Sequence, residues 1–292
     1  MSLATTSSLS TIFLCRGSSG VERGPEKAGV GSSILPLGTL MFIDTHSHLN
    51  FPDFSEDYPD VIARAKKAGI VAIINVGADL PTSKRAVELA QKEDLCYATV
   101  GIHPTNTNNP KDEDYQKLEE LAQKKKVVAV GEIGLDYFHN SIPKEIQKRS
   151  FEIQILLAKK LNLPVIIHNR DAHQDVLAIL EEKEVKKGVM HCFSGDINFA
   201  QKVLSLGLHI SFTGNLTYKK NEELRAAAKE IPLKKLLLET DCPYLPPQSR
   251  RGIRNEPGFL VYTAEGLAKI KGISLEELGE ITTNNARELF GI

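Results

Sequence analysis

The chain has 292 residues, of which 41% are hydrophobic, so it can bury a large core either as one barrel domain or as two smaller domains. Its formal net charge is −1, with 36 Lys and Arg residues against 37 Asp and Glu residues, which excludes the overall basic field of many nucleic-acid-binding proteins. The four cysteines lie far apart, which argues against a zinc ribbon and a disulfide framework and favours a reducing, cytoplasmic setting.

Residues 1–40 differ in composition from the rest of the chain. They are rich in Ser, Thr and Gly and show no strand or helix period, so we expect a non-core extension, disordered or spurious, ahead of a domain that covers residues 41–292. One interpretation is an organellar transit segment, favoured by a hydroxylated, acid-free start but opposed by Glu22 and Glu26. The interpretation we favour is an over-extended start with Met41 as the initiator, because residues 15–39 resemble the conceptual translation of a transfer-RNA gene.

From Met41 onward, short apolar runs alternate with segments of helical periodicity. The runs predict eight buried parallel strands, and the segments between them are long enough for the helices that parallel pairing requires. None of the runs approaches the roughly 18 to 20 apolar residues of a membrane span. The pattern predicts a single TIM (β/α)8 barrel. The expected strands are 41–48, 71–76, 97–102, 127–131, 163–167, 188–190, 208–213 and 236–240, and the expected helices are 58–68, 83–92, 114–125, 144–161, 172–182, 198–206, 222–229, 258–270 and 275–290.

Two of these helices carry further local signals. Ahead of 275–290, Ser274 precedes Glu277 by three residues, which is the spacing of a capping box. In 144–161, an apolar stripe of helical spacing predicts a face that packs on the sheet. Its members are Ile146, Phe151, Ile155, Leu156 and Leu161.

Side chains of the kind that bind metal ions stand at the ends of several expected strands. In the first strand, the period of two sends His46 and His48 to one face. The others can share a site only if the strands run parallel and their carboxyl ends gather at one face, as in a TIM barrel. A single histidine after a strand is more often structural, but the joint placement predicts a metal site. The candidate ligands are His46, His48, Glu132, His168, His191 and Asp241.

Six groups of motifs in this part of the chain resemble those of the TatD family of metal-dependent deoxyribonucleases. The resemblance spans essentially all of residues 41–292, with a departure at Ile253, where a lysine is usual between glycine and arginine. It implies a TIM barrel with a two-metal hydrolytic centre that acts on DNA ends. The motifs are FIDTHSHL from Phe42, VGIHP from Val100, VGEIGLD from Val130, VIIH from Val165, MHCFSG from Met190, and LETDCP from Leu238 with RGIRNEP from Arg251.

The resemblance also assigns the six candidate ligands to two metals. His46, His48 and Asp241 hold one ion, His168 and His191 hold the other, and Glu132 bridges them. Charge arithmetic agrees, because two divalent ions bring +4 and the two carboxylates bring −2, which leaves a centre of about +2 that attracts phosphate. The nitrogen-rich ligands suit zinc or another transition ion, with magnesium and manganese as alternatives. The expected reaction is two-metal phosphodiester hydrolysis, with Asp241 as a candidate general base.

Further side chains are expected around this site. His103 ends the third strand, where it contacts phosphate or protonates the leaving oxygen; packing is the competing interpretation. Glu239 and Asp44 are expected to support the ligands by hydrogen bonding, with a structural buried carboxylate as the alternative. In the loop after Glu132, Tyr137 is expected to stack a base unless it packs in the core.

The loop after the eighth strand is basic. Arg250, Arg251 and Arg254 occur there with no acid until Glu256, at the place where TIM barrels commonly bind phosphate. Arg251 and Arg254 are therefore expected to bind substrate. A compact basic cluster on a chain of nearly neutral charge fits the few phosphate contacts made at a strand end better than a long duplex footprint.

Two other classes of function remain open. An amidohydrolase or lactonase uses the same barrel and HxH motif on carbon-centred bonds, but Glu132 in the bridging position and the arginine loop favour phosphate. A non-catalytic nucleic-acid-binding module is the other alternative, although it has no need of six converging ligands. We therefore expect an exodeoxyribonuclease whose partner is DNA, without a membrane partner. Oligomeric state, cleavage polarity and strand preference stay open.

Overall fold

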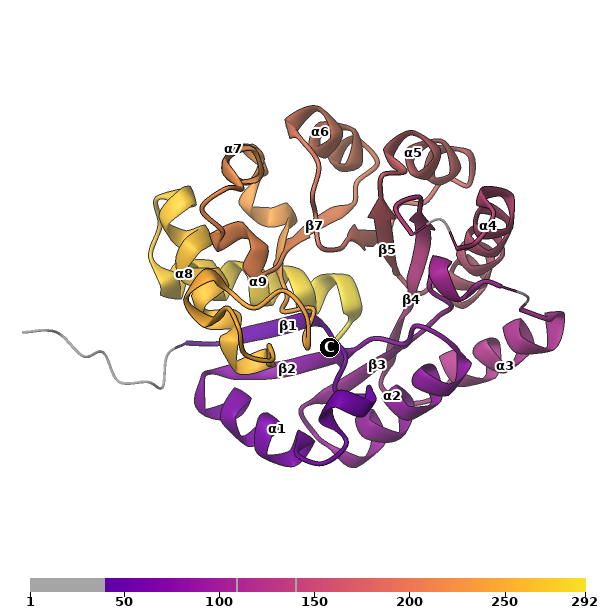
Figure 1. The fold of residues 1–292 in the computed structure, drawn as a ribbon, viewed down its shortest axis with the longest axis horizontal. Coiled ribbons are helices and arrows are strands. Elements are labelled where there is room, and N and C mark those ends of the chain that lie inside the picture. The colour runs from indigo at the N-terminus through magenta and orange to yellow at the C-terminus, as the bar shows by residue number, and fades with distance from the viewer. Residues whose placement is uncertain (1–39, 109, 140) are drawn as a thin grey trace, which may run out of the picture. The chain divides into compact units, whose positions relative to one another are not determined.

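The computed structural model describes residues 40–108, 110–139 and 141–292. In this part of the chain, eight parallel strands form one sheet in the order β1 to β8, with helices around it (Figure 1). The two edges of the sheet meet where Ser47 of β1 pairs in parallel with Cys242, just beyond β8. The predicted TIM barrel is confirmed. The predicted extension, residues 1–40, lies outside the described residues except for Leu40, which packs against the core.

Each predicted strand and helix has a counterpart in the structure. The bounds of α4 and α9 are those expected, whereas β4 continues beyond the predicted 127–131. Within the described ranges, no helix is both long and apolar enough to cross a lipid bilayer. The strands are β1 (Phe42–Ser47), β2 (Ile70–Asn75), β3 (Cys96–Val100), β4 (Val127–Asp136), β5 (Val165–Arg170), β6 (Gly188–Met190), β7 (His209–Phe212) and β8 (Leu236–Leu238). The helices are α1 (Tyr58–Lys67), α2 (Leu80–Lys92), α3 (Asp112–Ala122), α4 (Lys144–Leu161), α5 (His173–Glu182), α6 (Ile197–Ser205), α7 (Glu222–Glu230), α8 (Leu260–Lys271) and α9 (Leu275–Phe290).

The two local helix predictions are confirmed only in part. At the start of α9, the Ser274 hydroxyl oxygen accepts a hydrogen bond from the backbone N–H of Glu277 at 3.0 Å, as the capping spacing predicts. On α4, Phe151 is buried, but Ile146 and Leu156 are exposed, so the predicted stripe is wrong for these two. At 3.6 residues per turn, both lie about 140° around the helix from Phe151 and therefore face away from the sheet.

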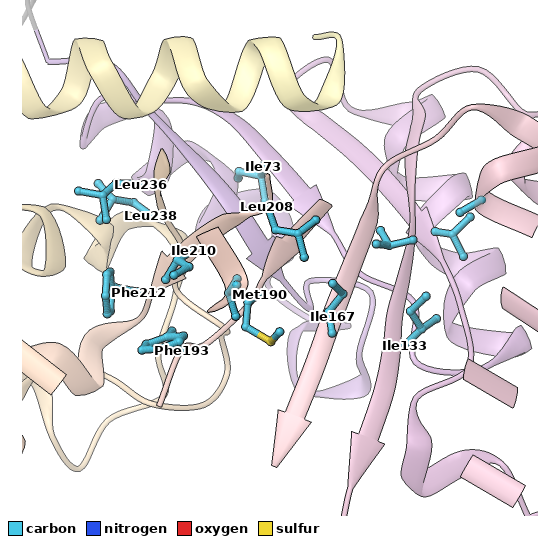
Figure 2. Close-up of a cluster of buried hydrophobic side chains, with 14 of the residues drawn as sticks. Ile73, Ile133, Ile167, Met190, Phe193, Leu208, Ile210, Phe212, Leu236 and Leu238 are labelled. Carbon is cyan, nitrogen blue, oxygen red and sulfur yellow. The ribbon is translucent and has the colours of Figure 1, made fainter. Parts of the chain in front are cut away.

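Two sets of buried apolar side chains surround the strands. One set combines strand and helix residues, and Figure 2 shows part of it, including Ile133, Ile167 and Leu238. The other set includes residues that share strand parity with candidate ligands, such as Ile166, two residues before His168, and Val189, two residues before His191. The C-terminal end of α9 packs into this second set. The candidate ligands therefore stand above an apolar floor, at the carboxyl ends of the strands.

A buried carboxylate joins the first strand to the segment after the last. Asp44 accepts hydrogen bonds from the backbone N–H and the hydroxyl of Thr240 at 2.9 and 2.6 Å, and its other contact is the backbone N–H of His46 at 3.4 Å. Burial raises the pKa of Asp44 to about 8, although the hydrogen bonds from Thr240 oppose the shift. Within the described residues, the carboxylate of Asp44 has no hydrogen bond to an imidazole ring, so its contacts match the alternative interpretation of a structural buried carboxylate. They link β1 to the segment after β8, where the barrel closes.

The substitution Asp44→Ala should lower the free energy of unfolding by about 1–3 kcal/mol, because it leaves the buried donors of Thr240 without an acceptor. Thr240→Val removes one partner of the same interaction, so the double variant should lose less stability than the sum of the single variants. Urea denaturation of the four proteins measures this coupling. Thr263→Val is the control, since the buried hydroxyl of Thr263 has no partner within the described residues. Strict additivity of Asp44→Ala and Thr240→Val would contradict the closing role.

Candidate metal centre

The first strand supplies two imidazoles that converge. The Nε2 atoms of His46 and His48 lie 3.2 Å apart, and both side chains are buried. The Nδ1 of His48 lies 3.0 Å from the carbonyl oxygen of Val76, which only accepts hydrogen bonds, so Nδ1 carries the proton and Nε2 keeps its lone pair. The lone pair on Nε2 of His48 therefore points toward His46 and the candidate site. Metal-binding histidines are oriented in the same way, by a hydrogen bond from the other ring nitrogen.

Asp241 faces these two imidazoles from the other edge of the sheet. Its Oδ1 lies 3.6 Å from Nε2 of His46 and 3.4 Å from Nε2 of His48. Its backbone N–H donates to the carbonyl oxygen of His46 at 2.8 Å, which holds it beside β1. The φ of Asp241 is +56°, in the left-handed region, where a non-glycine residue is strained and is found preferentially at functional sites.

Glu132 of β4 stands between two groups of histidines. Its Oε2 lies 3.4 Å from Nε2 of His46, whereas its Oε1 lies 2.7 Å from Nδ1 of His168 and 2.7 Å from Nε2 of His191. The Nε2 of His103 is 3.4 Å from the same Oε1. One carboxylate thus spans the His46 side and the His168 and His191 side, which is the geometry of a bridging ligand.

The charges at this centre are strongly coupled. Burial would raise the pKa of Glu132, but the imidazoles of His191 and His103 outweigh it and hold that pKa well below its usual value. Burial would lower the pKa of His191, but the carboxylate of Glu132 raises it well above its usual value. The pKa of His168 is raised as well, whereas burial lowers the pKa values of His46 and His103. A divalent cation bound here would compete with protons for the imidazole nitrogens.

The donor set fits metal ions. Three groups of His and Glu side chains each bring their ligand atoms within 4.8 Å of one another. In addition, the buried Nδ1 of His46 has no hydrogen-bond partner among the described residues. Nitrogen-rich sets with carboxylates are those of zinc and other transition ions. The groups are His46 with His48 and Glu132, His46 with His191 and Glu239, and His103 with Glu132 and His168.

Glu239 lies where the strand parity placed it. Its Oε1 is 3.4 Å from Nδ1 of His191 and accepts the backbone N–H of Cys192 at 2.6 Å, and its Oε2 accepts the hydroxyl of Ser211 at 2.6 Å. The carboxylate is therefore held in place by Cys192 and Ser211 and lies beside the ring of His191, on the side opposite Glu132.

Sequence reasoning missed Asp136. Its Oδ2 lies 3.1 Å from Nε2 of His168 and 2.9 Å from Nδ1 of His139, so it fixes the His168 ring from the side away from Glu132. Asp136 shares strand parity with Glu132. The sequence could have placed Asp136 on the same face as Glu132 only if the predicted strand had continued beyond Gly131. In the structure β4 continues because Gly134 lies close to β5; at φ +142°, a Cβ there would overlap the carbonyl oxygen of His168.

A cavity of about 870 Å³ opens above these ligands. Its wall includes five of the six candidate ligands together with His103, whereas His46 lies behind it. The rim carries aromatic and polar residues from the loops after several strands. The lining residues are His48, Phe51, Ala78, His103, Thr105, Asn106, Glu132, Asp136, His139, Ser141, His168, Asn169, Arg170, His191, Cys192, Ser194, Asp241, Tyr244 and Leu245.

Tyr137 does not line this cavity, in contrast to its expected role in stacking a base. Its hydroxyl donates to Asp175 at 2.6 Å, and the ammonium group of Lys144 lies 4.1 Å from its ring centroid. These partners on α5 and α4 hold Tyr137 in a separate, smaller pocket. The next residue, Phe138, is the exposed aromatic of this loop.

The two predicted substrate-binding arginines differ in their surroundings. Arg254 makes a bidentate ion pair with Asp57 at 2.6 and 3.0 Å, and its guanidinium lies 4.3 Å from the ring centroid of Phe54. Arg251 is exposed, lies 4.8 Å from the ring centroid of Tyr218, and has no carboxylate within 4.0 Å among residues 40–108, 110–139 and 141–292. Neither arginine lines the cavity. Of these two arginines, Arg251 is therefore the one without an ion pair among the described residues, whereas Arg170 is the arginine that lines the cavity.

Comparison with known proteins identifies a family and several relatives. Residues 43–291 match the family described as TatD related DNase. A protein of Bacillus subtilis (strain 168) named "Uncharacterized metal-dependent hydrolase YabD" is 45% identical over 254 residues, which are 86% of this chain and 100% of that protein. A protein of Edwardsiella piscicida named "3'-5' ssDNA/RNA exonuclease TatD" is 39% identical over 256 residues, covering 85% of this chain and 98% of that protein.

A solved structure has the same fold. It is that of YJJV, a TatD homolog from Escherichia coli K12, with a TM-score of 0.82 and 34% sequence identity. The match covers 86% of this chain and 98% of that one, so the barrel described above corresponds to nearly the whole of the related protein.

Protein purified without chelators should contain about two equivalents of divalent metal if Glu132 bridges two ions. Chelation should then lower the melting temperature, because an ion that binds only the folded state stabilises it. In Glu132→Ala, metal content and the effect of the chelator should both fall. Glu88→Ala, an exposed glutamate on α2, is the matched control. A wild-type melting temperature that chelation leaves unchanged, or a Glu132→Ala variant with full metal content, would contradict the bridging role.

Proposed function

The chain belongs to the TatD family of metal-dependent hydrolases, and we propose that it hydrolyses phosphodiester bonds at the ends of DNA strands. The position of Glu132 between two groups of imidazoles is the observation that carries this proposal. A pair of divalent ions bridged by one carboxylate suits in-line displacement at phosphorus. The name of the Edwardsiella piscicida relative, "3'-5' ssDNA/RNA exonuclease TatD", gives further support.

Electrostatics favour an anionic substrate. Two divalent ions bring +4, and the ligand carboxylates Glu132 and Asp241 remove 2, so a net charge of about +2 stays at the base of the cavity. In the proposed assignment, His46, His48 and Asp241 hold one ion and His168 and His191 hold the other. When bound, the ions supply Lewis-acid activation of the phosphoryl oxygen and of the attacking water.

Two protein side chains are proposed to transfer protons or contact the phosphate. Asp241 is the proposed general base, because its carboxylate lies at the cavity wall, with Oδ1 3.4 Å from Nε2 of His48. His103 presents Nε2 to the centre, since its Nδ1 lies 2.7 Å from the Thr105 hydroxyl. It is placed to contact the phosphate or to protonate the leaving oxygen.

End-labelled single-stranded DNA, offered to the metal-loaded protein beside a panel of amides and lactones, tests this function. We expect stepwise shortening of linear DNA, no cleavage of circular single strands, and no turnover of the small molecules. Asp241→Asn should lower kcat by about 10²–10⁴-fold, the range for loss of a general base. Asp60→Asn, on an exposed position of α1, should retain the activity. Turnover of amides or lactones without DNA cleavage would refute the proposal, and so would DNA binding without hydrolysis.

Arg251 is the proposed phosphate contact, whereas Arg254 holds its loop to Asp57. Arg251→Ala should raise KM for DNA by roughly ten- to a hundredfold, as expected for a lost charge-assisted hydrogen bond of about 1.5–3 kcal/mol. It should also reduce the dependence of log affinity on log salt by about one phosphate contact. Arg149→Ala, an exposed arginine on α4, is the control. An unchanged salt dependence in Arg251→Ala would remove Arg251 from the binding site.

A further inference from the structure

Two aromatic side chains at the mouth of the barrel are exposed to solvent. Phe138 is 55% exposed and Tyr244 is 54% exposed, and they are the large aromatic side chains in the exposed class within the described residues. The fold gives no packing reason for either exposure. Single exposed apolar residues are ordinary, but here Tyr244 lines the cavity and Phe138 contacts Arg170 and His139, which line it. That shared location suggests a function in binding.

The two rings stand on opposite sides of the cavity. Phe138 follows β4 and Tyr244 follows β8, and these strands are four positions apart in a barrel of eight. The candidate ligands Glu132 and Asp241 belong to the same two strands or their extensions, since Glu132 lies within β4 and Asp241 follows β8. A chain that crosses the mouth from one ring to the other therefore passes over the metal centre.

Each ring either contacts residues that line the cavity or lines it itself. The guanidinium of Arg170 lies 4.9 Å from the ring centroid of Phe138, and the ring of His139 meets it edge-on at 5.0 Å; both neighbours line the cavity. Tyr244 lines the cavity itself and lies edge-on to His48 at 6.4 Å.

The backbone holds both rings in position. The N–H of Tyr244 donates to the carbonyl oxygen of Asp241 at 3.0 Å, and its own carbonyl accepts from Asn255 at 2.6 Å. Tyr137, anchored on Asp175, fixes the direction of the loop that carries Phe138. Ordering such rings on binding therefore costs little conformational entropy.

We propose that Phe138 and Tyr244 are stacking sites for the two bases that flank the bond to be cleaved. The inference rests on the proposed function and adds the means by which the substrate is positioned. Flat apolar faces beside an arginine and a cation-binding centre match the alternation of bases and phosphates in a polynucleotide. Because every base has a π-face, such sites tolerate any sequence. Because the rings are on opposite sides of the cavity, the two bases must unstack and separate, so the strand end has to be unpaired.

The proposal is tested by removing an aromatic ring from the protein and a base from the DNA, separately and together. Cleavage of single-stranded DNA is measured for wild type, Phe138→Ala and Tyr244→Ala, with intact substrate and with an abasic nucleotide on either side of the scissile bond. Each alanine variant should raise KM by about five- to 150-fold on intact DNA, the equivalent of one lost stacked base. For each variant, that penalty should vanish when the abasic nucleotide occupies one of the two positions, and that position should differ between the variants.

Conservative and matched variants separate stacking from structural damage. Phe138→Trp and Tyr244→Phe should restore the wild-type KM, because each keeps a flat ring. Leu156→Ala, which truncates a 56% exposed side chain on the outer helix α4, should have no effect. Wild type should also cleave a single-stranded end faster than a blunt duplex end, and the alanine variants should lose part of this difference.

The outcomes distinguish this inference from the proposed function. If wild type shortens DNA but the alanine variants lose the same factor on intact and abasic substrates, the stacking sites are refuted while the nuclease proposal stands. An unchanged KM in both alanine variants would also refute the stacking sites. If wild type cleaves no DNA, the nuclease proposal and the stacking sites fail together.

Discussion

The contact of one buried carboxylate with imidazoles from four strands is the interaction on which the rest of the structure depends. Glu132 lies within 3.4 Å of nitrogen atoms of His46, His103, His168 and His191. A buried carboxylate is costly unless positive partners and hydrogen bonds surround it. A barrel of parallel strands provides that surrounding, because its strand ends meet at one face. The same cluster of imidazole and carboxylate groups has the donor set of a metal site.

Substrate selection depends on features around this centre rather than on the barrel, which hosts many reactions. The mouth is asymmetric in its charges: Arg254 is neutralised by Asp57, while Arg251 is available to an anion. Its two exposed aromatic side chains, Phe138 and Tyr244, follow strands on opposite sides of the barrel. In the proposed function, a metal-loaded centre, a nearby arginine and two flat faces would together suit a short stretch of single-stranded polynucleotide.

Much of the fold could be predicted because its signals are local. Apolar runs separated by helical periods indicated eight strands in order, and the pairing of His46 with His48 followed from the strand period of two. What local patterns could not predict was the choice between neighbouring residues. Tyr137 turns away from the cavity because Asp175, far along the chain, accepts its hydroxyl. Phe138, one residue later, is therefore the exposed ring.

The sequence by itself determined the barrel, the strand ends that carry the candidate ligands, and the family, since each depends on residue types at short, regular spacings. Only the tertiary structure decided which side chains support those ligands. Asp136 behind His168, Asp44 bonded to Thr240 rather than to an imidazole, and Arg254 paired with Asp57 all depend on contacts between distant segments. Those contacts follow from how closely the strands approach and how each side chain turns, and these are properties of the packed barrel that no short sequence pattern contains.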